Sequence, residues 1–215
     1  MLGNDVVDLA HHGTQPGAQH PRFDARVFSE RERALIAGNP SQPLRWVLWA
    51  AKEAAYKAAK KLDRAMVWAP ARFEVELDSR LGGCVRHGER AFLLRVEQTS
   101  AYVHVLAQDS AALAALRSAA SDALHSAASN ALHCGVAEHA SPDASAEARA
   151  FACRTLAARL GISEARLAVA KNGRIPVLCA DGALASADLS LSHHGRFVAF
   201  ACELAPGALA ARLAS

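Results

Sequence analysis

The 215-residue sequence predicts an α+β fold built from two similar halves, each a small antiparallel sheet packed on a long helix. The first observation is a repeated layout. Residues 101–119 and 196–215 each hold a short apolar strand, then a polar break, then "ALAA" and an arginine. The second observation is that the segments upstream of these two copies follow the same order of elements. A matched order of elements indicates duplication within the chain.

The first half is predicted from an alanine-rich segment followed by alternating segments. Alanine is the best helix former, which favours a helix over 43–62. Strict alternation of apolar and polar residues, as in "FEVEL" and "YVHVLA", is typical of strands with one buried face. Strands are therefore expected over 72–77, 91–96 and 101–107, with a glycine-containing turn between the first two.

The second half repeats this order. A helix over 143–160 begins after Ser141 and Pro142, a capping serine followed by proline at the first helical position, and ends at Gly161. Strands are expected over 166–170, 187–192 and 196–202, with the turn "KNGRIP" after the first.

An Ala/Ser-rich stretch separates the halves. We predict a first α+β half over 1–118, a linker over 119–142 and a second α+β half over 143–215. Leucines at 116, 124 and 132 allow part of this stretch to be helical.

Composition limits the classes of function. The net charge of +3 and the pI of about 8.7 are too mild to indicate nucleic acid, but they are compatible with anionic ligands. No apolar run approaches the ~18 residues of a membrane span, and acidic residues stand where a signal peptide would be basic. Five scattered cysteines without a CxxC indicate a reduced, cytoplasmic protein with no thiolate metal site.

Two acidic positions suggest a metal site. Asp5 lies in the apolar segment "GNDVVDL", where a buried carboxylate is costly unless it is paired or bound to a metal. Together with Glu53 it would supply two hard oxygen ligands, which suits Mg²⁺. Mg²⁺ completes its shell with water and substrate phosphate, and Lys57, one turn after Glu53, could reach that phosphate. The alternatives are a short edge strand flanked by Asp5 and Asp8, and a surface Glu53–Lys57 pair worth ~0.3–0.5 kcal/mol.

Two turns could bind an anion. In "LSLSHHGRFVAFA", Ser192 and His193 come at the end of a strand, just before a glycine. Hydroxyl, imidazole and backbone N–H groups at such a turn can hold a phosphate. Upstream, "KNGRIP" offers Lys171 and Arg174 beside a second turn. The alternatives are an ordinary polar hairpin and a solvated basic turn.

Taken together, these motifs resemble the 4′-phosphopantetheinyl transferases. The resemblance lies in "GND" near the start, "WAAKEAAYK" about 45 residues later, a turn of the G-R/K-x-P kind and "SLSHHGRFVAFA". "RVFSERERALIAG" at 26–38 also resembles a segment that, in this family, often precedes the helix with the Lys-Glu ("KE") pair, here Lys52 and Glu53. The resemblance covers nearly the whole chain except the linker.

The order of the motifs is unusual for the family. Short members carry the GxD, KE and SH motifs in this order and assemble as trimers. Long members are single-chain pseudo-dimers in which the half with the SH motif precedes the half with the GxD and KE motifs. This chain resembles the long type with its halves exchanged, which implies a pseudo-twofold arrangement and a monomer. Two positions depart from the pattern: Val7 stands where the long type has a metal carboxylate, and Asn4 stands where an apolar residue is usual.

The resemblance implies an enzyme, a 4′-phosphopantetheinyl transferase with holo-acyl-carrier-protein synthase activity. It would move the 4′-phosphopantetheine arm of coenzyme A to a serine of an apo carrier protein and release adenosine 3′,5′-bisphosphate. Asp5 and Glu53 would hold Mg²⁺, Lys57 would neutralise phosphate, and Glu53 is also the candidate base. The residues expected to grip coenzyme A are Lys171, Arg174, Ser192 and His193. The partner would be an acyl or peptidyl carrier protein of fatty acid, polyketide or nonribosomal peptide synthesis.

Two other functions remain open at this stage. One is a non-catalytic relative that binds coenzyme A or a carrier protein, for which Val7 is a mild indication. The other is a small metal-dependent phosphohydrolase that uses Asp5, Asp8 and the His11–His12 pair, and that would release phosphate without any carrier protein.

Overall fold

The first half is a five-stranded antiparallel sheet covered by one long helix. The computed structural model describes residues 1–39, 43–78, 82–111 and 132–205. The strands follow the order β1-β5-β4-β3-β2, and α3 (Pro43–Leu62) packs against β1 and β5. The strands are β1 (Leu2–Asp8), β2 (Glu74–Leu77), β3 (Gly82–His87), β4 (Arg90–Gln98) and β5 (Tyr102–Asp109). The short helices of this half are η1 (His12–Thr14), α1 (Phe23–Val27), α2 (Glu30–Gly38) and η2 (Pro70–Arg72).

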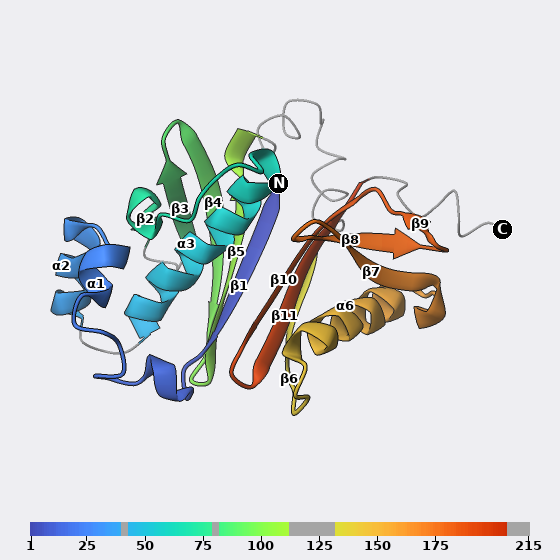
Figure 1. The fold of residues 1–215 in the computed structure, drawn as a ribbon, viewed down its shortest axis with the longest axis horizontal. Coiled ribbons are helices and arrows are strands. Elements are labelled where there is room, and N and C mark those ends of the chain that lie inside the picture. Colours follow the sequence, from blue (N-terminus) through green and yellow to red (C-terminus); the bar gives the residue numbers. More distant parts are fainter. Residues whose placement is uncertain (40–42, 79–81, 112–131, 206–215) are drawn as a thin grey trace.

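The second half repeats the first with its sheet in two parts. One part has the order β10-β11-β6 and the other β7-β8-β9, and α6 (Ala144–Leu160) packs against the first part. The strands are β6 (Leu132–Glu138), β7 (Leu167–Asn172), β8 (Ile175–Ala180), β9 (Ala183–Leu184), β10 (Ala187–His194) and β11 (Phe197–Leu204). A short helix, η3 (Glu164–Arg166), precedes β7. Figure 1 shows the two halves side by side, with β1, β10 and β11 in the middle and α3 and α6 on opposite sides.

The predicted α+β architecture is confirmed. In each half the first strand pairs with the last one, β1 with β5 and β6 with β11, and the long helix follows the first strand. The predicted helix over 43–62 coincides with α3. Gly161 ends α6 in the left-handed conformation, with φ of 66°, as predicted. No helix among the described residues is long and apolar enough to cross a membrane.

Three details of the prediction are corrected. Strand β6 lies inside the stretch assigned to a linker, so the second half begins at Leu132 rather than at 143. The part of that linker before residue 132 lies outside the described residues. The N-cap of α6 is Asp143, whose side chain accepts from the Ala146 N–H, rather than Ser141. Strands β3 and β8 occupy segments that were not predicted as strands.

The alanines of α3 let the helix lie very close to β1. Six of them are fully buried: Ala50, Ala51, Ala54, Ala55, Ala58 and Ala59. Gly3 of β1 faces this helix so closely that a Cβ atom there would lie 2.0 Å from the Ala54 carbonyl oxygen. The glycine of "GND" is therefore required by close packing of backbone on backbone.

A buried ion pair joins α3 to the elements around it. Lys52 Nζ lies 2.8 Å from a carboxylate oxygen of Glu32 in α2, and the two side chains are 0% and 2% exposed. Lys52 also donates to the carbonyls of Pro70 and Phe73. Glu32 in turn accepts from the backbone N–H groups of Ser29 and Val75. The lysine of the "KE" pair is thus part of the internal scaffold.

We expect Lys52→Met to lower the free energy of unfolding by about 3–5 kcal/mol, because it leaves the Glu32 carboxylate buried without its cation. Urea unfolding would measure the loss. The matched double variant Lys52→Met/Glu32→Gln removes that charge and should be less destabilised than the sum of the two single variants. Strict additivity in this cycle would contradict the pairing.

Candidate active site

The two halves meet where β1 runs alongside β10. The outward N–H groups of β1 are bonded by side chains of β10, not by its backbone, so the two strands belong to separate sheets. These bonds run from the N–H of Leu2 to Asp188 (2.6 Å), of Asn4 to Ser190 (3.0 Å) and of Asp8 to His194 (3.1 Å). We call this set of contacts the seam.

One end of the seam explains the "GR" of "SHHGR". The buried Asp8 carboxylate accepts from the backbone N–H of Arg196 and from two nitrogens of its guanidinium, each at 3.0 Å. Gly195 has φ of 55°, and a Cβ atom there would lie 2.4 Å from an Asp8 oxygen. Burial raises the pKa of Asp8, but the hydrogen bonds from Arg196 and Ala10 outweigh it and lower the pKa to about 2. Gly195 and Arg196 therefore fasten the β10–β11 turn to the end of β1.

The structure brings Asp5, Glu53 and Lys57 together. Lys57 Nζ donates to Asp5 Oδ1 at 2.7 Å and to the carbonyl of Asn4 at 3.0 Å. Burial and the nearby Asp5 carboxylate raise the pKa of Glu53 to about 7, against the opposing effect of Lys57. Two carboxylates that repel each other, with an ammonium group bound to one of them, are a common sign of a functional site.

Asp5 and Glu53 are the two carboxylates here that could hold a magnesium ion. No group of three His, Cys, Asp or Glu side chains within the described ranges is placed to hold a metal. Mg²⁺, however, commonly binds through one or two carboxylates and completes its shell with water and substrate phosphate. Asp5 and Glu53 can supply those two carboxylates.

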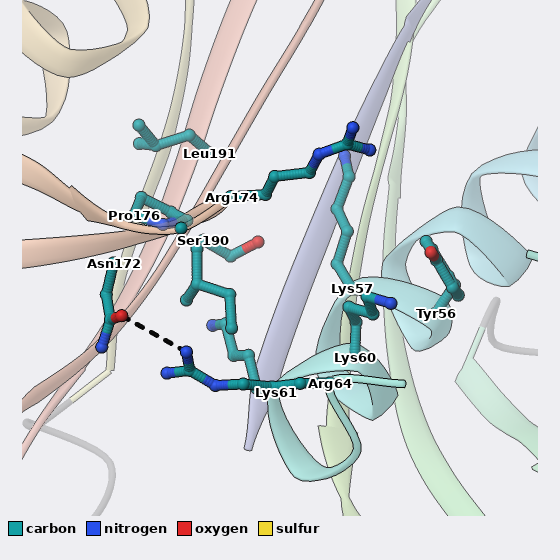
Figure 2. Close-up of a pocket in the computed structure, with 12 residues that line it drawn as sticks. Tyr56, Lys57, Lys60, Lys61, Arg64, Asn172, Arg174, Pro176, Ser190 and Leu191 are labelled. Carbon is teal, nitrogen blue, oxygen red and sulfur yellow. Dashed lines mark hydrogen bonds between the residues drawn. The ribbon is translucent and has the colours of Figure 1, made fainter. Parts of the chain in front are cut away.

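A cavity of about 560 Å³ lies beside these residues, between α3, the β7–β8 hairpin and β10. Figure 2 shows Lys57, Lys60 and Arg64 on its α3 side and Arg174 reaching in from the hairpin. Arg64 donates to the Asn172 side chain across the cavity at 3.3 Å. Arg174 has no hydrogen-bond or ion-pair partner among the described residues. The cavity is thus basic and formed by both halves, which suits a ligand carrying several phosphates.

The other cations of the cavity are held by the protein. Lys60 donates to the Met66 carbonyl. Lys61 is 7% exposed, forms an ion pair with Asp188, and donates to the carbonyls of Leu2 and Leu189. Burial lowers the pKa of Lys61, and Asp188 opposes that effect. Lys61 is therefore a seam residue rather than a surface lysine.

The predicted coenzyme-gripping residues do not lie together. Arg174 lines the cavity, whereas Lys171 is exposed in β7 and is not among the lining residues. Ser192 is 4% exposed and accepts a hydrogen bond from the Asn4 side chain at 3.0 Å, so it lies within the seam. His193 is exposed at its outer side, but the part of the ring that faces the protein is desolvated; this desolvation and Lys57 lower its pKa, with Asp5 opposing. His193 therefore lies within electrostatic range of the Asp5–Lys57 pair.

Sequence reasoning missed the cations at the end of α3. Lys60 and Lys61 follow Lys57 by three and four residues, and Arg64 comes just after the helix ends at Leu62. Residues three and four apart share one face of a helix, so this pattern could have indicated a basic wall. Asn172, which meets Arg64 across the cavity, gave no signal because its partner is 108 residues away.

Comparison with known proteins yields one family. The family model of the 4′-phosphopantetheinyl transferase superfamily matches residues 1–116, just over half of the chain. Among solved structures, this chain is similar to one described as "Chronobacterium ammoniagenes ACPS-CoA complex", with 21% identity and a TM-score of 0.38. That match covers 49% of this chain and 93% of the other. No curated protein matches the chain.

We expect acid to weaken the Asp8–Arg196 clamp. The folded pKa of Asp8, about 2, lies below its ordinary value of 3.8, so the clamp contributes fully above pH 4 and is lost as the pH falls toward 2. Asp8→Asn should cost about 1–2 kcal/mol at pH 7 and should flatten the acid limb of the stability curve. Chemical unfolding at several pH values measures both effects. Glu147→Gln, which breaks the exposed Glu147–Arg154 pair, serves as the control and should cost under ~0.5 kcal/mol.

We expect Glu53→Gln to stabilise the protein at alkaline pH. The folded pKa of about 7 lies above the ordinary 4.5, so the folded state binds the proton more tightly and wild-type stability falls between pH 4.5 and 7. Gln removes this cost, and the variant should gain about 1–3 kcal/mol at pH 8 and much less at pH 5. Glu89→Gln in the exposed β3–β4 turn is the matched control. A gain that does not depend on pH would contradict the placement of Glu53.

Proposed function

The chain belongs to the 4′-phosphopantetheinyl transferase superfamily, and from this premise we propose that it transfers the 4′-phosphopantetheine arm of coenzyme A to a serine of an apo carrier protein. The observation that carries the proposal is the basic cavity between the halves, which is lined by Lys57, the lysine that donates to Asp5. Coenzyme A carries a pyrophosphate and a ribose 3′-phosphate, so a cavity with several cations matches its charge.

The reaction is a substitution at phosphorus. The serine oxygen forms a bond to the phosphorus that carries the pantetheine arm. The bond from that phosphorus to the bridging pyrophosphate oxygen breaks, and adenosine 3′,5′-bisphosphate leaves with that oxygen. The serine proton passes to a base, so atoms and charge balance. The tasks left to the protein are positioning and charge stabilisation.

Glu53 is the proposed base, directly or through a water. A base works best when its pKa is close to the working pH, and burial together with Asp5 raises the pKa of Glu53 to about 7. Lys57 brings an ammonium group one helical turn away, where it can neutralise charge on the pyrophosphate. Asp5 and Glu53 would hold Mg²⁺, which when bound supplies Lewis-acid stabilisation of the phosphate oxygens.

Arg174 and His193 are proposed to bind the nucleotide end of coenzyme A. Arg174 projects into the cavity with its guanidinium free of partners within the described part of the chain. His193 follows Ser192 at the end of β10 and is exposed. Ser192 would act by holding this strand in place. Lys171 precedes the lining residue Asn172 but is not itself among the lining residues, so we give it no direct contact in the proposed site.

The carrier protein and the oligomeric state are part of the same proposal. Carrier proteins are generally acidic, so a mildly basic enzyme favours their approach. Both walls of the cavity come from one chain, α3 from the first half and the β7–β8 hairpin with β10 from the second. A monomer would therefore contain a whole site.

The geometry does not favour the phosphohydrolase alternative. Its carboxylates have separate partners, because Asp8 is bound by Arg196 while Asp5 is bound by Lys57. His11 Nδ1 accepts the N–H of Gly13 and belongs to a local turn. Within the described residues, Asp5, Asp8 and the two histidines form no group placed to hold a metal.

Mass spectrometry of an apo carrier protein, after incubation with the protein, coenzyme A and Mg²⁺, tests the proposed function. We expect a mass gain of one phosphopantetheine, which should disappear without coenzyme A.

Asp5→Ala should reduce the rate by on the order of 10²–10³. Arg174→Ala should mainly raise the KM for coenzyme A, because it removes binding common to ground and transition states, while the matched Lys171→Ala should not. Absence of any gain with carrier proteins from fatty acid, polyketide and peptide synthesis would refute transfer.

A further inference from the structure

Asn4 is a fully buried polar residue at the centre of the seam. It is 0% exposed and lies in β1, between β5 of its own half and β10 of the other half. It directly precedes Asp5. A polar side chain that is buried completely is unfavourable unless it is hydrogen-bonded, so the polarity of Asn4 calls for a physical reason.

The donors of Asn4 reach both halves. Its backbone N–H donates to Ser190 Oγ at 3.0 Å, and its side-chain Nδ2 donates to Ser192 Oγ at 3.0 Å. Nδ2 also lies 3.2 Å from Nε2 of His104 in β5. On the acceptor side, the Asn4 carbonyl receives Lys57 Nζ at 3.0 Å. One residue therefore contacts α3, β5 and two positions of β10.

His104 fixes the direction of the Asn4 amide. The ring is 2% exposed, and burial, with Lys57 and Arg95 nearby, lowers its pKa to about 4, so it is neutral at pH 7. His104 Nδ1 faces the Glu97 carboxylate at 4.0 Å, which favours a proton on Nδ1 and leaves Nε2 as the acceptor. The Nδ2 group of Asn4 must then point toward His104 and Ser192.

This arrangement carries a cost that an apolar residue would avoid. Asn4 Oδ1 is buried and has no hydrogen-bond partner. A reversed amide would be worse, because it would leave the two N–H donors in that place. An unsatisfied buried acceptor is unfavourable, so the side chain is retained for what its donors hold.

We propose that Asn4 is a positioning residue, which fixes the end of β10 that carries His193 relative to Lys57 of α3. The inference rests on the proposed function and extends it, because it names the contact that keeps the nucleotide-binding strand in register with the lysine. The same residue meets Ser192 through its side chain and Lys57 through its carbonyl. A small shift of either group separates the phosphate-binding parts contributed by the two halves.

The test compares Asn4→Ala with Val6→Ala. Val6 is the matched control, because it lies in the same strand and is 1% exposed. Its apolar side chain packs on Phe197 and Ala199 of the other half and can form no hydrogen bond. Both variants should melt at a lower temperature. At a temperature where both are fully folded, Asn4→Ala should lower kcat/KM for coenzyme A by about tenfold or more, and Val6→Ala by under about threefold.

A spectroscopic readout that is independent of transfer accompanies the kinetics. In ¹⁵N NMR of the full chain, His104 Nε2 should resonate as an unprotonated, hydrogen-bonded nitrogen at pH 7. Asn4→Ala should shift that resonance, whereas Val6→Ala should leave it in place. An unmoved resonance in Asn4→Ala, wild-type kcat/KM for that variant, or equal losses in both variants would overturn the inference.

If the proposed function is wrong, the wild-type protein itself modifies no carrier protein. In that case, calorimetry of adenosine 3′,5′-bisphosphate binding is measured in place of the transfer kinetics. The inference then stands if Asn4→Ala both loses affinity for this nucleotide relative to Val6→Ala and shifts the His104 resonance. It falls if either change is absent.

Discussion

The outer edge of β1 is the constraint on which the rest of the structure depends. An edge strand presents unpaired N–H groups, and in the middle of a protein these groups need partners. Here the partners are side chains of β10, namely Asp188, Ser190 and His194. Because side chains intervene, the two sheets do not merge into one. The basic cavity is bordered by α3 from one half and by β10 with the β7–β8 hairpin from the other.

Several motif residues serve this arrangement rather than chemistry. Gly3 lets α3 pack closely against β1, Lys52 forms a buried ion pair with Glu32, and Gly195 leaves space for the Asp8 carboxylate. Such residues hold the candidate active-site groups in place without touching a substrate. Of the two residues in the "KE" pair, Glu53 is the one that we propose as a base. Its neighbour Lys52 is held in the buried ion pair with Glu32, within the scaffold that supports the helix.

Local sequence patterns predicted the long helices and most strands, but not contacts between distant segments. Helix α3 follows from its own alanines, and Gly161 ends α6 by its own backbone preference. Strand β6, in contrast, is stabilised by pairing with β11, some 65 residues later, and its sequence "LHCGVAE" alternates only weakly. The contact of Ser192 with Asn4 could not be predicted from a local pattern, because the two residues lie 188 positions apart. Asp5, Glu53 and Lys57 could be grouped in advance because helix spacing and charge both pointed to them.

Two unfavourable buried polar groups lie beside the Asp5–Lys57 pair. Glu53 has a pKa raised to about 7 by burial and by Asp5, and Asn4 Oδ1 is buried without a partner. Either could be removed by an ordinary apolar or neutral residue, and both lie within one helical turn or one residue of the Asp5–Lys57 pair. Proteins rarely keep such costs except where function needs them. The contacts that join the halves therefore lie next to the groups that the proposed transfer would use, so stability and reactivity are expected to depend on neighbouring contacts.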